Sequence, residues 1–241
     1  MNMHITVTLK FMRNKFLLRK LRFYSEANAK SLLLETIPNY LSLSQDFIDN
    51  PERALELVSG MTVHKDFLSE DEEKSILNEI EPYMKRLRYE FDHWDDAIHG
   101  YRETERLNWN DDNTKIINRV RSIAFPPHAA QLKYVHILDL DRNGYIKPHI
   151  DAVRFCGTTI AGLSLLSDSV MRLVHDKQKN LFADVLLQRR SLYIMKNIAR
   201  FDYTHEILKN ENSIFKGEQI YKDRRISVIC RNEPDPNNQS I

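Results

Sequence analysis

Residues 132–151 read LKYVHILDLDRNGYIKPHID, and this stretch decides how the rest of the chain is interpreted. Its first half is rich in Val, Ile, Leu and Tyr, most of which favour strands. Asn143-Gly144 is a turn signal, and a second apolar run follows it up to Asp151. The stretch therefore predicts short antiparallel strands, and it marks the change from helical to strand patterns along the chain.

Downstream of this point, short apolar runs recur with small turns between them. They lie near 145–151, 158–166, 170–175, 183–187, 191–196, 200–208 and 225–231. No long helical pattern separates them, which disfavours a parallel α/β sheet and favours an antiparallel sandwich or jelly roll. The predicted fold class is α+β, mainly β, with a jelly-roll core and supporting N-terminal helices.

The upstream half carries the helical patterns. Ser69 and Glu72 form the S-x-x-E of a capping box, and apolar residues follow at helical spacing. Pro82 should kink or break that helix. A second amphipathic helix is predicted over 116–124. Residues 89–105 are polar and aromatic with few aliphatic side chains, so they are expected to form a loop.

The N-terminus differs from the rest of the chain. Residues 1–24 hold six of the 35 basic residues and none of the 34 acidic ones, with apolar residues between the bases. This pattern is typical of a mitochondrial transit peptide, and it predicts location in the mitochondrial matrix; a basic tail that is not a transit peptide is the alternative. Residues 25–60 are expected to be a weakly structured N-terminal arm with a short helix near 52–58. We expect one domain over 61–232 and a disordered tail over 233–241.

Composition excludes several function classes. The six glycines form neither G-x-G-x-x-G nor a Walker P-loop, and the two cysteines form neither a disulfide framework nor C-x-x-C. No run of 18 apolar residues predicts a membrane span. Residues 25–241 hold the remaining 29 basic and all 34 acidic residues, a net charge of −5. That part of the chain therefore has no overall attraction for a polyanion such as nucleic acid.

One candidate metal motif lies at the end of the opening stretch, at His149-Ile150-Asp151. Side chains two residues apart on a strand point to the same face, about 6–7 Å apart along it. A second histidine would complete two-His-one-carboxylate ligation, which leaves positions open on an Fe(II) ion. His205, 54 residues after Asp151 in a strand-like run, is the best third ligand. His175 and His136 compete on composition alone.

A second signal is the strand-like run Arg224–Arg231. Ile226, Val228 and Cys230 share one face, and the opposite face carries Arg225, Ser227, Ile229 and Arg231. If the arginine face looks into a barrel, its charges need a partner. A dicarboxylate is apt, because Arg binds carboxylate bidentately. Exposure of both arginines to solvent is the alternative interpretation.

Together these motifs resemble the AlkB family of Fe(II)- and 2-oxoglutarate-dependent dioxygenases. The family pattern is H-x-D, a distant His and then R-x₅-R, here in the order His149, Asp151, His205, Arg225, Arg231. Further similar segments are YEFDHWD at 89–95, IHGYRETE at 98–105, GYIKPH at 144–149, IAGLSLLS at 160–167, MRLVH at 171–175 and SLYI at 191–194. The resemblance covers roughly 61–232.

The resemblance implies a double-stranded β-helix (jelly-roll) core, with Fe(II) as cofactor and with 2-oxoglutarate and O₂ as cosubstrates. The Fe(II) ligands would be His149, Asp151 and His205. The residues for 2-oxoglutarate would be Arg225 at its distal carboxylate, Ser227 assisting it, Arg231 toward the metal, and Tyr193. Family members that repair nucleic acids also use an Asn and a Tyr, 11 and 9 residues before the first ligand. Leu138 and Leu140 stand there in this chain, so cosubstrate binding would depend more on Tyr193 and the arginine strand.

The implied activity is hydroxylation of a C–H bond. An N-methyl group would then be lost as formaldehyde, whereas a protein side chain would stay hydroxylated. Six acidic residues within 89–105 would repel a duplex, so duplex DNA is disfavoured and a protein side chain or a small molecule is favoured. Demethylation of mitochondrial RNA stays as an alternative. The resemblance also implies a link to regulated necrosis and fatty-acid metabolism.

Two other classes remain open at this point. A non-catalytic scaffold on the same fold would keep the architecture without the activity. A zinc hydrolase would use the same three ligands, but it has no need for a dicarboxylate-binding arginine pair. The sequence makes no prediction of oligomeric state.

Overall fold

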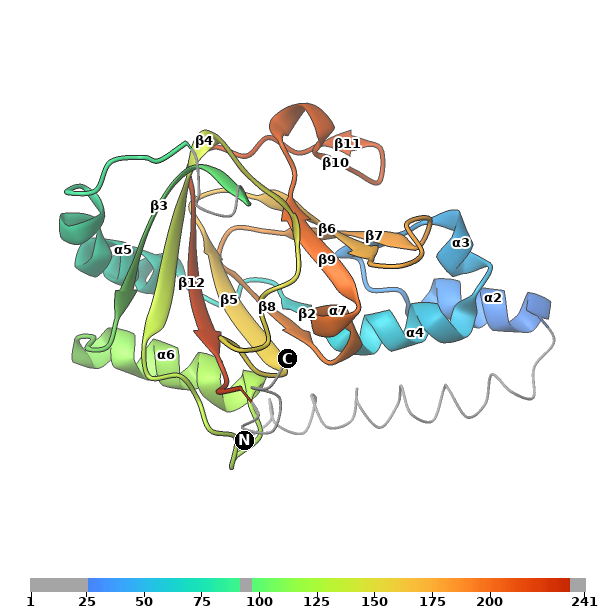
Figure 1. The fold of residues 1–241 in the computed structure, drawn as a ribbon, viewed down its shortest axis with the longest axis horizontal. Helices are drawn as coiled ribbons and strands as arrows, with labels where there is room; N and C mark the ends of the chain where they lie inside the picture. The colour runs from blue at the N-terminus through green and yellow to red at the C-terminus, as the bar shows by residue number, and fades with distance from the viewer. Residues whose placement is uncertain (1–25, 92–96, 235–241) are drawn as a thin grey trace.

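The computed structural model describes residues 26–91 and 97–234, which fold around one curled antiparallel sheet (Figure 1). The strand order is β1-β7-β6-β9-β4-β12-β5-β8-β2, and β3 pairs with β4 off this path. The mainly-β, jelly-roll prediction is confirmed. The strands are β1 Leu41–Leu43, β2 Met61–His64, β3 Ile98–Arg106, β4 Val135–His149, β5 Thr159–Leu165, β6 Ser169–His175, β7 Phe182–Leu187, β8 Ser191–Lys196, β9 Tyr203–Ile207 and β12 Arg225–Arg231, with a separate pair β10 Ile214–Phe215 and β11 Glu218–Gln219.

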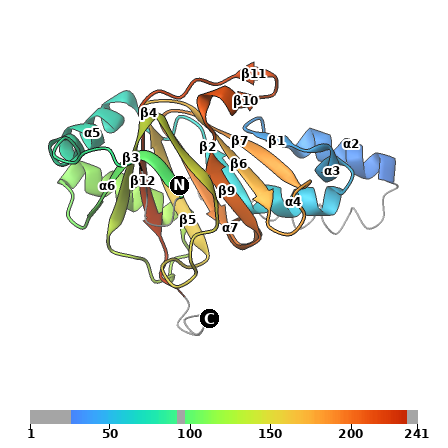
Figure 2. The ribbon, with the colours of Figure 1, turned by 45° about the horizontal axis from the view of Figure 1, so that its top comes forward.

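Helices cover the sheet from two sides (Figures 1 and 2). Apolar side chains of α5 and α6 pack on the outward faces of β4, β12, β5 and β8, whereas α2 to α4 lie at the other end of the molecule. None of the helices in the described ranges is long and apolar enough to cross a membrane. The helices are α2 Glu26–Thr36, α3 Gln45–Ile48, α4 Pro51–Gly60, α5 Glu70–Met84, α6 Asp111–Ala124 and α7 Ile198–Phe201, with a short 3₁₀ turn at Asn210–Asn212.

Strand β4 joins the two halves of the sheet. Its first part lies between β3 and β12, where Leu138 pairs with Glu103 and Ser227. Its last residue, His149, pairs with His205 on β9 in the other half. The predicted turn at Asn143-Gly144 is wrong, because β4 runs through it as one strand. The glycine serves a close approach instead, since a Cβ on Gly144 would overlap the backbone of Gly100 in β3.

The loop expected over 89–105 is also wrong in its second part, which forms strand β3. In the described chain this strand pairs with β4 and makes one isolated bridge from Tyr101 to Glu90, and Glu103 and Glu105 on it are exposed. A strand covered on one face needs few aliphatic residues, which is why the composition suggested a loop. Gly100, at φ +64°, marks a break in the register between His99 and Tyr101.

The arm expected over 25–60 is not weakly structured where the structure describes it, from residue 26. It forms α2, β1, α3 and α4, and it contributes buried side chains to the same core cluster as β6 to β9. Phe47 in α3 stacks on Tyr203 with ring centroids 6.1 Å apart, two residues before His205. The predicted transit peptide at 1–24 and residues 235–241 of the predicted tail lie outside the described residues.

The two helices predicted near the sheet are confirmed. Ser69 and Glu72 form both bonds of the capping box at the start of α5, and α6 ends directly before Phe125. Helix α5 continues two residues past Pro82, so the proline stands in its last turn. The run expected as a strand over 200–208 begins instead as the end of α7 and becomes β9 at Tyr203.

The packing of the arm predicts a stability effect. Phe47→Ala removes a fully buried ring and is expected to lower the free energy of unfolding by about 3–5 kcal/mol, as measured by urea denaturation. Leu34→Ala in α2 is the control, because that side chain is 59% exposed and should change stability by about 0.5 kcal/mol or less. Equal effects of the two substitutions would contradict this account of the arm.

Candidate active site

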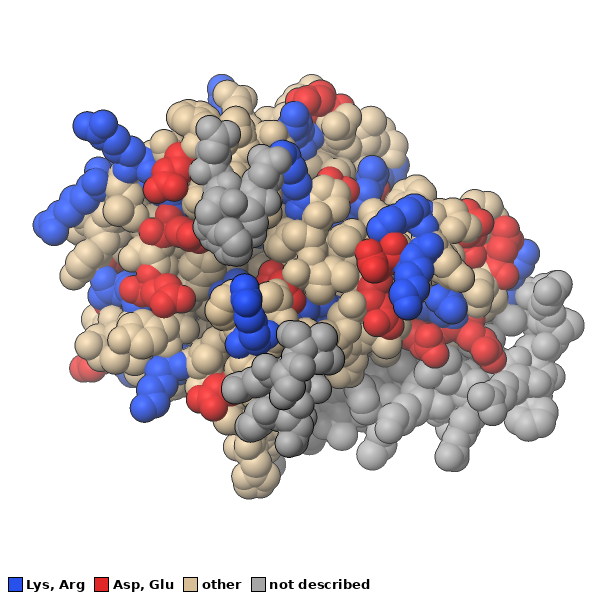
Figure 3. All heavy atoms as spheres, in the orientation of Figure 1, with Lys and Arg blue, Asp and Glu red and all other residues tan. Residues whose placement is uncertain are grey.

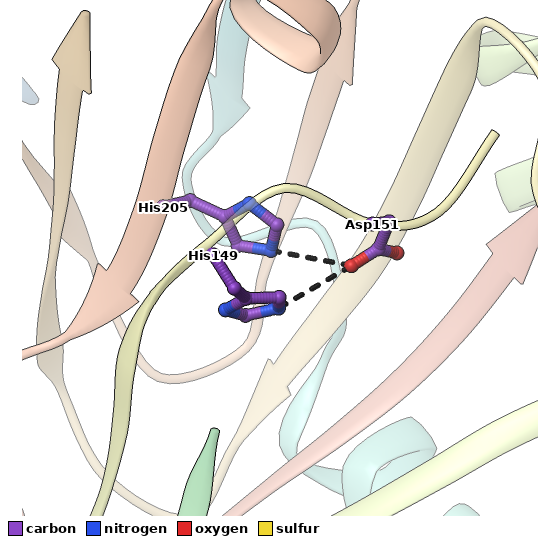
Figure 4. A group of neighbouring side chains, drawn as sticks. All are labelled: His149, Asp151 and His205. Atoms are coloured by element: carbon purple, nitrogen blue, oxygen red, sulfur yellow. Dashed lines mark ion pairs between the residues drawn. The ribbon is translucent and has the colours of Figure 1, made fainter. Parts of the chain in front are cut away.

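Three side chains converge where β4 and β9 meet, and Figure 4 shows them pointing toward one another. His149 ends β4, Asp151 follows it in the next loop, and His205 lies opposite on β9. Oδ1 of Asp151 lies 3.3 Å from Nε2 of His149 and 3.7 Å from Nε2 of His205. The two imidazole ring centroids are 4.2 Å apart. Such separations fit ligand atoms that share one ion at about 2.1 Å.

The orientation of the two rings suits metal binding. Nδ1 of His149 lies 2.9 Å from the carbonyl oxygen of Lys147, which only accepts, so Nδ1 donates the hydrogen. Nε2, the other ring nitrogen, faces Asp151 and is the atom left for a metal ion. A second hydrogen bond of this kind orients a histidine ligand. Within the described chain, Nδ1 of His205 is buried without a hydrogen-bond partner.

Burial and charge set the ionisation of the cluster. Burial lowers the pKa of His205 to about 3, with a contribution from His149, so the His205 ring is neutral near pH 7. Burial alone would raise the pKa of Asp151, but His149, His205 and Arg231 together hold it below its usual value. The cluster therefore presents two imidazoles, of which that of His205 is neutral, and one carboxylate, the donor set of non-haem Fe(II) sites.

A cavity of about 740 Å³ opens beside this cluster, which is within the usual size of ligand sites. Arg225 lines it and is only 1% exposed. Its Nε donates to Oγ of Ser164 at 3.1 Å, and its Nη2 has no hydrogen-bond partner among the described residues. Burial lowers the pKa of this guanidinium, because desolvation disfavours the charge. A buried arginine with an unpaired N–H suits an anionic ligand.

Tyr193 and Ser227 complete this wall. Burial raises the pKa of the Tyr193 hydroxyl, so it stays protonated beside Arg225 and Ser227. Gly162 pairs with Tyr193 across β5 and β8, and a Cβ on Gly162 would overlap the tyrosine ring. Sequence reasoning missed Gly162, although a glycine inside a strand signals such a close approach.

All seven candidate site residues line this one cavity. They are His149, Asp151, His205, Tyr193, Arg225, Ser227 and Arg231. Leu138, at one position where the chain departs from its family, also lines the cavity, whereas Leu140 is buried and is not part of the lining. On β12 the predicted division of faces is confirmed, since Ile226, Val228 and Cys230 pack toward α5 and α6.

The competing histidines lie elsewhere. His175 ends β6 and contacts Arg53 and Tyr203, away from the cluster. His136 does line the cavity, but it contacts Arg231 and Glu103 and is not part of the metal-binding group. Sequence reasoning missed this role because the partner Glu103 belongs to β3, which was expected to be a loop.

The residues present fit both groups that the family resemblance implies. A two-His-one-carboxylate set stands beside a cavity of suitable volume, and the buried N–H of Arg225 is available for a carboxylate. A zinc hydrolase would explain the first feature and not the second.

Comparison with known proteins agrees with this geometry. A Mus musculus protein named alpha-ketoglutarate-dependent dioxygenase alkB homolog 7, mitochondrial, is 53% identical over 173 residues, which is 72% of this chain and 78% of the relative. The Bos taurus protein of the same name is 51% identical over 179 residues, 74% and 81% of the two chains. No model of a protein family matches the sequence.

Solved structures show the same fold at low sequence identity. OsALKBH1 has a TM-score of 0.55 at 12% identity, covering 71% of this chain and 97% of that structure. A prolyl-4-hydroxylase from Pseudomonas putida has a TM-score of 0.53 at 12% identity, covering 73% and 93%. The identity to the two mitochondrial relatives, over more than two thirds of each, shows that the chain belongs to the AlkB family of 2-oxoglutarate-dependent dioxygenases.

Proposed function

We propose that this chain hydroxylates a C–H bond, with Fe(II) held by His149, Asp151 and His205. The observation that carries the proposal is one cavity with two chemically distinct walls. One wall presents two imidazoles and a carboxylate, and the other presents a buried arginine whose Nη2 has no hydrogen-bond partner in the described chain. When bound, Fe(II) with 2-oxoglutarate and O₂ supplies the oxidation, and 2-oxoglutarate is converted to succinate and CO₂.

The other site residues bind and orient the cosubstrate. Arg225 pairs with the distal carboxylate of 2-oxoglutarate, since its burial and its unpaired N–H favour an anion. The protonated hydroxyls of Tyr193 and Ser227 add hydrogen bonds beside it. Arg231, 3.4 Å from Oδ2 of Asp151, lies toward the metal. Leu138 takes the place of a polar cosubstrate contact and makes this part of the cavity apolar.

The favoured substrate is a protein side chain or a small molecule. Glu103 and Glu105 line the cavity and are exposed at its edge. On the described part of the face in Figure 3, acidic and basic side chains are interspersed, whereas a nucleic-acid site needs a continuous basic surface. The names of the relatives support a mitochondrial location, and we place the chain in the matrix because its basic N-terminal segment is typical of a transit peptide.

Cosubstrate binding tests the proposal. Anaerobic titration of the chain with Fe(II) and 2-oxoglutarate is expected to give the visible metal-to-ligand charge-transfer band. His205→Ala removes a metal ligand and Arg225→Met removes the carboxylate partner, so both should lose the band, whereas the exposed Arg142→Met should keep it. A chain without the band would contradict the proposal and favour the non-catalytic scaffold.

The buried histidine predicts a pH dependence for the metal-free protein. The pKa of His205 is about 3 when folded and about 6.5 when unfolded. Its contribution to stability is complete above pH 6.5 and is lost as the pH falls toward 3, because the unfolded chain then binds the extra proton. The free energy of unfolding should fall by up to about 1.4 kcal/mol per pH unit more steeply than in His205→Ala. Equal slopes in urea titrations between pH 6 and 4 would contradict the burial of a neutral ring.

The reaction products distinguish the substrate classes. Incubation with a mitochondrial protein fraction should raise succinate release several-fold and add 16 Da to a peptide. The same chain with mitochondrial RNA should leave formaldehyde at the level of the His205→Ala variant. Formaldehyde release with RNA, without hydroxylated peptide, would support the demethylase instead.

A further inference from the structure

We propose that His136 and Glu103 are positioning residues that hold Arg231 in place and thereby select the oxygen of Asp151 that faces the metal. The inference rests on the proposed function and extends the site beyond the residues that its family pattern marks. Glu103, His136, Arg231 and Asp151 are called here the rim-to-metal network. It runs from the exposed edge strand β3 to the metal ligands.

The network is continuous across three strands and a loop. Oε2 of Glu103 on β3 lies 2.8 Å from Nε2 of His136 on β4. Nδ1 of His136 lies 3.2 Å from Nη1 of Arg231 on β12. Nε of Arg231 lies 3.4 Å from Oδ2 of Asp151 in the loop after β4. All four side chains line the same cavity.

The direction of the hydrogen bonds follows from the chemistry of each group. A guanidinium only donates, so Nδ1 of His136 must accept from Arg231. The hydrogen of this neutral ring is then on Nε2, where it donates to the Glu103 carboxylate. One tautomer of His136 therefore satisfies both neighbours, and Glu103 selects that tautomer.

Arg231 depends on His136 for its orientation. Its contact with Asp151 is an ion pair that lacks hydrogen-bond alignment, and its Nε is buried without a hydrogen bond. Within the described ranges, the bond to His136 is the one hydrogen bond that its side chain makes. The side chain is 22% exposed, so without His136 the guanidinium would be able to rotate toward solvent.

The orientation of Arg231 matters for the metal. Arg231 forms its ion pair with Oδ2 of Asp151. The other oxygen, Oδ1, is then the one that faces the imidazoles, 3.3 Å from Nε2 of His149 and 3.7 Å from Nε2 of His205. Loss of the guanidinium would free the carboxylate to turn. Removing partners of this kind weakens metal binding by about 10–100-fold in other proteins.

Metal affinity tests the proposal without turnover. Mn(II) binding to the full chain is followed by electron paramagnetic resonance, with thermal unfolding of the metal-free variants as a check on folding. His136→Leu is expected to raise the Kd about tenfold. His136→Asn should lose less, because its Oδ1 is able to accept from Arg231. Glu105→Gln is the matched control, since Glu105 lies on the same strand and lines the cavity without belonging to the network, and its Kd should not change.

A double-mutant cycle adds a measurement that would not change if His136 only stabilised the fold. Glu103 and Arg231 are linked through His136. The effects of Glu103→Gln and Arg231→Lys on the Kd for Mn(II) should therefore be non-additive in the wild-type background. In the His136→Leu background, where the link is broken, the two effects should be additive. Equal Kd values for His136→Leu and Glu105→Gln, equal losses in His136→Leu and His136→Asn, or additivity in both backgrounds would overturn the proposal.

The outcomes separate this inference from the proposed function. Suppose that the chain binds Mn(II) and gives the charge-transfer band with Fe(II) and 2-oxoglutarate, but that all the variants bind Mn(II) with the same Kd. This result would overturn the rim-to-metal network and leave the proposed function standing. A chain that binds neither metal overturns both.

Discussion

The pairing of His149 with His205 across β4 and β9 is the constraint on which the site depends. β4 is long enough to pair with β3 and β12 in its first part and with β9 at its end, so it carries the metal motif from one half of the sheet to the other. A slip of one residue would turn His149 to the opposite face of the sheet. On the other side of β4, the backbones of Gly144 and Gly100 approach closely at the point where the register between β3 and β4 shifts.

The buried charge of Arg225 is the second constraint. A guanidinium removed from water costs free energy unless hydrogen bonds and an anion compensate it. Ser164 satisfies one N–H, and Tyr193 lies beside the charge in the space that Gly162 leaves open. Nη2 of Arg225 has no partner in the described chain, so this wall suits a ligand that brings its own negative charge. The same argument separates an oxygenase from a zinc hydrolase, whose three metal ligands would look identical.

The sequence predicted best those features that are formed by residues close to one another along the chain. The capping box at Ser69 and the faces of β12 depend on residues close in sequence, and the structure has them where they were expected. The H-x-D motif does bring His149 and Asp151 together, but β4 ends at His149, so Asp151 lies in the next loop and not on the strand as expected. The errors concern segments whose state is decided by distant partners. Asn143-Gly144 favours a turn in isolation, yet it continues a strand because Gly100 packs against it. β3 has the composition of a loop, yet pairing with β4 makes it a strand. His136 had no assigned role for the same reason, since its partner Glu103 lies on that strand.

The N-terminal arm, residues 26–60, packs against β9, the strand that carries His205. Phe47 packs on Tyr203, and Tyr203 begins the strand that presents His205 two residues later. The same strand pairs with β4, whose last residue His149 comes just before the loop that carries Asp151. The arm thus packs on Tyr203 near the start of β9, and the pairing of His149 with His205 joins β9 to β4 two residues later. Residues 26–60 therefore carry none of the candidate site residues and still pack against the strand that carries His205. A domain drawn from the motifs alone would lack this packing.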